Sequence, residues 1–202
     1  MRKIKFLSVC LSCIAVMTIT FTSCNSDDDY HTLTTAEVQQ AYNNVRGDYS
    51  GKLIYAATNP KNANDNTDTL AISWSIKTDS TLVIKDFPTR LLATNITNTN
   101  IKEALANANN IDLTCYTGYF QINPVAFYLN PKSPSYNLDY NGKTNKVQIA
   151  FYGNTNYSYG IADSKGKMQI QIIEGAVYEN GTLVSSGLSK NTFFFLISDT
   201  KI

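Results

Sequence analysis

Three short turn signals divide the second half of the chain, and they constrain its fold more than any other feature. Asn141-Gly142, Lys165-Gly166 and Asn180-Gly181 each place glycine where a positive φ angle is easily adopted. Asn-Gly between two apolar runs is the strongest short-range signal for a β-hairpin. We therefore expect the segments on either side of each turn to pair as antiparallel strands.

The residues around these turns alternate between apolar and polar, as the residues of half-buried strands do. In one such run Leu70, Ile72, Trp74 and Ile76 share a face, and small polar residues separate them. The alternation predicts strands over 49–55, 70–76, 81–85, 111–122, 125–129, 137–140, 146–152, 157–161, 167–173, 176–178, 182–185 and 192–198.

Two short helices are predicted beside the strands. Thr34 and Glu37 have the spacing of a capping box, in which each side chain accepts a backbone N–H. An apolar stripe then recurs at steps of three and four residues and stops before Gly47, which predicts a helix over 34–45. A shorter apolar stripe predicts a second helix over 100–108.

The sequential hairpins indicate a mainly antiparallel β fold with one or two short helices, of the α+β class. So many strands must close into a barrel or form two packed layers, because long open edges invite aggregation. We therefore expect a β-sandwich or a partly open barrel. The predicted helix followed by Gly47-Asp48-Tyr49-Ser50-Gly51 is similar to the entry into lipocalin-like barrels of small exported proteins.

The amino-terminal end has the layout of an export signal. A cationic start over residues 1–5 precedes an uncharged stretch over 6–21, which is shorter than the about 20 apolar residues that cross a bilayer. Phe21-Thr22-Ser23-Cys24 resembles the lipobox of bacterial lipoproteins, and this resemblance implies that Cys24 becomes the lipidated first residue. We predict a signal peptide over 1–23; the alternative is a secreted protein cleaved near Ser23.

An acidic segment follows the predicted lipidation site. Asn25-Ser26-Asp27-Asp28-Asp29 resembles the export signal of Bacteroidetes lipoproteins displayed on the outer face of the outer membrane. The resemblance implies an outer-membrane protein that faces the cell exterior; the alternative is a solvated acidic tether, since like charges extend a linker. We predict a tether over 24–32 and a single β-rich domain over 33–202, a length that suits one core.

Charge and cysteine content narrow the possible functions. Removal of the leader leaves 14 basic against 16 acidic side chains, a balance of −2, so no basic surface is expected to attract nucleic acid. Cys10 and Cys13 leave with the leader and Cys24 carries lipid, so Cys115 has no partner for a disulfide. Because the single histidine, His31, lies on the tether, we interpret Cys115 as a small buried apolar residue and not as a nucleophile.

The chain as a whole resembles a family of Bacteroidetes lipoproteins of about this size whose function has not been assigned. The resemblance rests on the lipobox, on the acidic tether, and on the stretch over 33–53 that contains Val38-Gln39-Gln40-Ala41-Tyr42 and Tyr49-Ser50-Gly51-Lys52-Leu53. It implies a membrane anchor and brings no catalytic residues.

Tyrosine gives the main indication of function, with 13 in the chain. Tyr157 and Tyr159 lie on one face of a predicted strand, and Tyr116, Tyr119 and Tyr128 cluster earlier. Exposed tyrosine suits the binding of glycans or proteins, because it offers a wide apolar ring with a polar tip. We predict a non-enzymatic module that binds a glycan, peptide or partner protein through Tyr157 and Tyr159 or through a central barrel cavity.

Two alternatives stay open. A hydrolase would need two carboxylates within about 5 to 9.5 Å of each other, and its candidates in or beside predicted strands are Asp112, Asp139, Glu174 and Glu179. A structural or assembly role in the envelope is compatible with the same sequence. We expect no cofactor and no metal, because the Asn-rich loop over 59–68 lacks the glycine and glutamate of a calcium-binding loop.

Overall fold

A computed structural model describes residues 32–57, 66–153, 157–186 and 193–201. Cys24, the leader and most of the predicted tether lie outside these residues. The first described helix is α2 (Thr35–Val45), and both predicted capping-box hydrogen bonds are present. The Thr34 N–H donates to the Glu37 carboxylate at 2.8 Å, and the Glu37 N–H donates to the Thr34 hydroxyl at 3.3 Å. The predicted helix start is therefore confirmed.

Strands make up most of the rest. They run in chain order as β1 (Gly47–Ala56), β2 (Thr67–Thr78), β3 (Thr81–Phe87), β4 (Ile111–Ile122), β5 (Val125–Pro131), β6 (Ser135–Tyr140), β7 (Lys143–Tyr152), β8 (Tyr159–Ala162), β9 (Met168–Glu179), β10 (Thr182–Ser186) and β11 (Phe193–Lys201). Two helices, α3 (Thr89–Leu92) and α4 (Thr99–Ala106), lie between β3 and β4. The four-residue α3 was not predicted.

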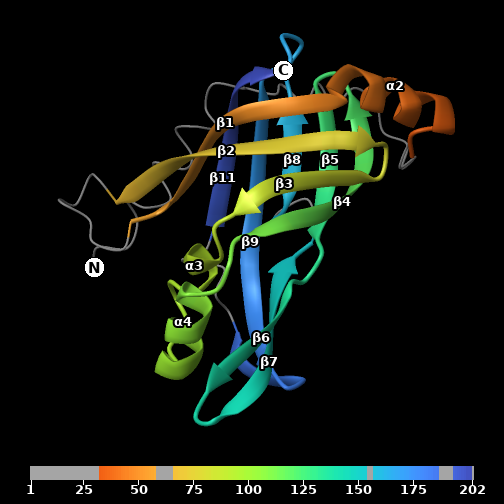
Figure 1. The fold of residues 1–202 in the computed structure, drawn as a ribbon. Coiled ribbons are helices and arrows are strands. Elements are labelled where there is room, and N and C mark those ends of the chain that lie inside the picture. The colour runs from red at the N-terminus through yellow and green to blue at the C-terminus, as the bar shows by residue number, and fades with distance from the viewer. Residues whose placement is uncertain (1–31, 58–65, 154–156, 187–192, 202) are drawn as a thin grey trace, which may run out of the picture.

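Among the described residues, eight strands close into an antiparallel barrel (Figure 1). The order around it is β11, β1, β2, β3, β4, β5, β8 and β9, and β9 pairs with β11 to complete the circle. The mainly antiparallel β fold with few short helices is thus confirmed. The sequence left a sandwich or a partly open barrel; the structure shows a closed barrel, which agrees in part with the lipocalin-like expectation.

The three predicted hairpins are confirmed. β6 pairs with β7, β8 with β9, and β9 with β10, each antiparallel. Asn141 and Gly142 have φ angles of 53° and 74°, and Asn180 and Gly181 have 50° and 82°. Two successive positive φ angles are those of a type I′ turn, whose twist matches that of the flanking strands.

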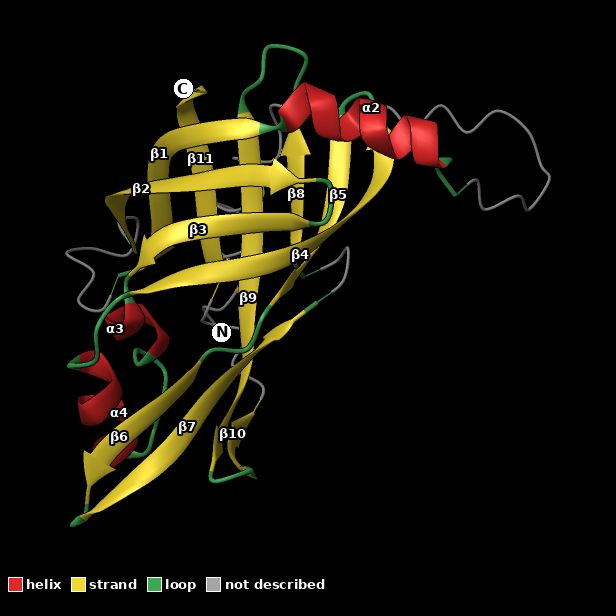
Figure 2. Ribbon diagram, turned by 45° about the vertical axis from the view of Figure 1, so that its right-hand side comes forward, coloured by secondary structure: helices red, strands yellow, loops and turns green. Residues whose placement is uncertain are grey.

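One long strand replaces two that the sequence predicted. The segments 167–173 and 176–178 form β9 without a break, and the register shifts where Ala150 and Phe151 face Ala176 and Glu174. The first half of β9 belongs to the barrel, where it pairs with β8 and β11. Its second half pairs with β7 and β10, so that β6, β7, β9 and β10 extend beyond the barrel (Figure 2).

Large buried side chains fill the barrel. The rings of Tyr49 and Trp74 stack with their centroids 5.6 Å apart, and the Trp74 indole N–H donates to the Met168 sulfur at 3.3 Å. The rings of Tyr119 and Phe127 also contact each other, at 5.4 Å. Because these side chains occupy the interior, the outer wall of the barrel offers more room for a ligand than its centre does.

The helix α2 lies across one end of the barrel (Figures 1 and 2). Ala41 and Val45 are buried on its inner side, and the Tyr42 hydroxyl donates to the Lys77 carbonyl at 2.8 Å. In the described part of the chain, no helix is long and apolar enough to cross a membrane.

Candidate functional site: an aromatic wall outside the barrel

The outward face of β4 carries the first residues of the site. Tyr116 and Phe120 alternate with residues that point into the barrel, and Tyr119 is one of the latter. Its side chain is buried, and burial raises the pKa of its hydroxyl. Of the three tyrosines that lie close in the sequence, Tyr116, Tyr119 and Tyr128, Tyr119 is therefore not exposed, because a period of two sends residues 116 and 119 to opposite faces.

Strand register brings the remaining aromatic residues beside these two. Tyr128 on β5 pairs with Gly118 on one side and with Tyr159 on the other. The Leu129 N–H donates to the Ser158 carbonyl at 3.0 Å, which places Tyr157 next to Asn130. Because Asn130 pairs with Tyr116 in turn, Tyr116, Asn130 and Tyr157 form a row across three neighbouring segments.

Two stacked pairs strengthen the wall. The rings of Phe120 and Tyr128 lie 4.4 Å apart with an interplanar angle of 27°. The rings of Tyr152 and Tyr157 lie 4.8 Å apart with an angle of 29°. Such offset stacks contribute about 0.5–1.5 kcal/mol beyond the burial of area, so they hold the rings in fixed orientations. We define the aromatic wall as Tyr116, Phe120, Tyr128, Tyr152, Tyr157 and Tyr159.

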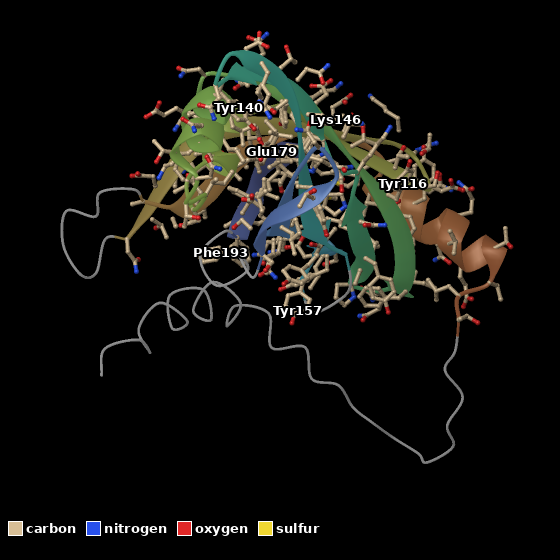
Figure 3. The ribbon with its side chains drawn as sticks, turned by 90° about the horizontal axis from the view of Figure 1, so that it is seen from below. Tyr116, Tyr140, Lys146, Tyr157, Glu179 and Phe193 are labelled. Atoms are coloured by element: carbon tan, nitrogen blue, oxygen red, sulfur yellow. The ribbon has the colours of Figure 1, made fainter. Side chains whose placement is uncertain are left out.

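Exposure distinguishes this wall from the rest of the described surface. The large apolar side chains that stand exposed are Tyr116 (51%), Tyr128 (42%), Tyr157 (38%), Phe120 (36%) and, away from the wall on β10, Leu183 (51%). Four of these five lie on the aromatic wall, and Figure 3 labels Tyr116 and Tyr157. A monomeric protein seldom gathers exposed apolar side chains in one place unless they bind something.

Polar groups lie among the rings. The exposed Asn130 amide sits between Tyr116 and Tyr157, and the Gln171 amide donates to the Tyr157 carbonyl at 3.0 Å. Burial raises the pKa of Tyr159, which keeps its hydroxyl neutral and able to donate a hydrogen bond. The wall therefore combines flat apolar surfaces with uncharged hydrogen-bonding groups.

The four candidate carboxylates lie in different surroundings. Asp112 is exposed and pairs with Lys85 at 2.6 Å, and the hydrogen bond from Lys85 lowers its pKa. Asp139 accepts the Thr144 hydroxyl, and Glu179 accepts the Tyr140 hydroxyl at 2.6 Å.

Glu174 differs from the other three because its side chain is fully buried. It lies five positions from Glu179 along β9, which separates the two by roughly 16 Å. These two acids are therefore too far apart for the usual glycosidase arrangement.

Cys115 packs in the core with no exposed surface, as predicted, and burial raises the pKa of its thiol. A thiol without exposure cannot reach a substrate, so the structure supports its interpretation as an apolar residue.

Sequence reasoning missed Phe120 and Tyr152 as members of the site. The period of two gives one signal for Phe120, because it places residues 116 and 120 on the same face. Tyr152 has no comparable signal, since its role depends on a ring stack with Tyr157.

Comparison with known proteins identifies a family that has no assigned activity. A model described as a domain of unknown function (DUF4840) matches residues 44–179. The match runs from the end of α2 to the end of β9 and so includes the whole aromatic wall. No curated protein and no solved structure matches the chain. The chain therefore belongs to the DUF4840 family of unknown function.

Proposed function

We propose that this protein is a lipid-anchored outer-membrane lipoprotein of the Bacteroidetes type that binds glycans at the cell exterior through its aromatic wall. The observation that carries the proposal is the gathering of four exposed aromatic side chains on neighbouring segments. Sugar rings present apolar C–H faces that suit aromatic rings, and their hydroxyl groups suit amides such as that of Asn130.

The spacing within the wall favours a chain of sugar rings over a single ring. Tyr116 and Tyr157 lie on either side of Asn130, so their backbones are roughly 10 Å apart, twice the distance between neighbouring strands. The stacked pair of Phe120 and Tyr128 provides a further apolar surface next to this row. A ligand that covers both surfaces has to be extended, as an oligosaccharide is.

Removal of two wall aromatics tests the binding. We expect Tyr128→Ala and Tyr157→Ala each to weaken glycan binding roughly tenfold, since buried aromatic contacts dominate binding energies. Mobility in native gels that contain a panel of soluble polysaccharides measures the effect. Leu183→Ala is the matched control, because Leu183 is as exposed as Tyr116 but lies on β10. If the polysaccharides slowed all three variants as strongly as the wild type, the proposal would be contradicted.

Gly118 allows a test that keeps every aromatic residue. It lies opposite Tyr128, and an added Cβ would come no closer than 3.8 Å to the Tyr128 ring. We expect Gly118→Val to cover this ring and weaken glycan retardation without lowering the melting temperature. Unchanged retardation by Gly118→Val would exclude Tyr128 from the site.

Anchoring is tested separately at Cys24. The lipobox resemblance and the acidic segment after it support the anchor, and two or more acyl chains give stable attachment. We expect Cys24→Ala to move the protein from the membrane fraction to the soluble fraction, with unchanged glycan binding. Mass spectrometry of the wild-type amino terminus should show an acylated Cys24, and an unmodified cysteine would contradict the anchor.

A further inference from the structure

The strand β6 forms an edge of the extension beyond the barrel. It pairs with β7 on one side, and no described strand pairs with its other side. The Ile149 N–H donates to the Pro134 carbonyl at 3.1 Å, which shows that even-numbered residues of this segment exchange hydrogen bonds with β7. The main-chain N–H and C=O groups of Asn137 and Asp139 therefore point away from β7, and no bond to them is found within the described residues.

A cleft of about 580 Å³ runs beside these groups. One side is lined by the consecutive β6 residues Tyr136, Asn137, Leu138 and Asp139, and the other by the end of α4 and the segment that follows it. Successive residues of a strand point to opposite faces. A cleft lined by four in succession therefore follows the edge of β6 and does not lie over one face of the sheet.

The sequence of the edge carries none of three common protective devices. Sheets commonly block an open edge with lysine, proline or a bulge, or cover it with a helix or loop. The sequence of β6 contains neither lysine nor proline, and its pairing with β7 has no shift of register. The cleft lies between this edge and α4 with the segment after it, and an edge beside such a cleft is the geometry in which a further strand can be added.

We propose that β6 binds an extended peptide from another protein, which adds as a strand and pairs with the main chain of Asn137 and Asp139. Its side chains alternate between two environments. On one face they meet Leu138 and Ala108, which favours apolar residues, and on the other they meet the exposed Asp139 carboxylate, which favours a basic residue. This site is separate from the aromatic wall and does not depend on glycan binding.

The test uses the purified lipoprotein and fluorescent decapeptides that alternate valine with lysine or with glutamate. We expect anisotropy to show binding of the Val-Lys peptide at least tenfold tighter than that of the Val-Glu peptide. Asp139→Lys should reverse this preference. Equal binding of both peptides, or binding of neither, would overturn the proposal.

Asn137→Pro tests the main-chain pairing. Proline removes the N–H of residue 137, and because that N–H makes no bond to β7 the fold should tolerate it. We expect Asn137→Pro to bind the Val-Lys peptide at least tenfold more weakly with an unchanged melting temperature. Asn137→Ala keeps the N–H and should bind within about twofold of the wild type.

Two further results discriminate between occupants of the edge. A peptide N-methylated on its valine amides and one N-methylated on its lysine amides should bind the protein with different affinities, because only one set of N–H groups can face β6. If Asn137→Pro and Asn137→Ala lost the same affinity for the Val-Lys peptide, the strand-addition model would be overturned. Light scattering that shows a wild-type dimer, converted to a monomer by Asn137→Pro, would replace the peptide with a second copy of this chain.

Discussion

Replacement of Gly51 by alanine should destabilise the barrel by about 3 kcal/mol, the upper end of the usual loss from overpacking. A Cβ at this position would lie 2.0 Å from the Ile197 carbonyl oxygen and 2.9 Å from the Ser198 Cα, both in the backbone of β11. The strand that closes the barrel would have to move, because backbone cannot yield as a side-chain tip does. Gly51 also marks a register shift between β1 and β11.

Gly118→Ala is the control for this prediction. It makes the same substitution in the same barrel, but its Cβ would approach no atom more closely than 3.8 Å. Urea denaturation of both variants should show a large loss for Gly51→Ala and a change within about 0.5 kcal/mol for Gly118→Ala. Similar midpoints for the two variants would mean that β1 and β11 do not approach each other as described.

Glu174→Gln should stabilise the protein increasingly as the pH rises. The carboxyl is fully buried where β9 leaves the barrel, and burial raises its pKa well above the ordinary value. Below the pKa of the unfolded chain both states hold the proton. As the pH rises past that value, the unfolded chain ionises first, so the wild type loses stability by at most about 1.4 kcal/mol per pH unit until the folded pKa is reached.

The amide of the Gln variant cannot ionise, so this loss should disappear. Denaturation of both proteins between pH 4 and pH 8 measures it, and the difference in the free energy of unfolding isolates Glu174, because every other group is shared. The two proteins should be similar near pH 4, where both carry a neutral side chain, and should diverge above it. A difference that stays constant over this range would contradict a buried, neutral Glu174.

Local signals predicted the elements of the fold well. The strand over 111–122 matches β4 in both bounds, and each Gly-containing turn joins the two strands that flank it. The error at β9 has a physical reason: Glu174-Gly175 resembles an interruption, whereas the structure buries the acid and continues the strand. The closure of the barrel could not be predicted from local signals, because it depends on β11 pairing with both β1 and β9, which lie far from it in the chain.

The candidate site was predicted only in part. The alternation around residues 157–161 placed Tyr157 and Tyr159 on one face of a strand, and the structure begins that strand only at Tyr159 and brings Tyr128 and Phe120 beside these two residues. That neighbourhood requires the register of β5 against β8, strands about 30 residues apart in the chain, for which no short-range rule exists. Glycan binding at these residues remains a prediction.

The pairing of β1 with β11 has a consequence for how the chain is made. Leu53 faces Leu196, so the barrel joins nearly the first and nearly the last described residues. Until synthesis reaches β11, β1 and β9 are open edges of a curved, unfinished sheet that can pair with other chains. Closure therefore has to wait for β11, which follows every other strand of the barrel in the chain. A chain truncated before residue 193 would keep the turns and hairpins but lack the strand that joins both edges.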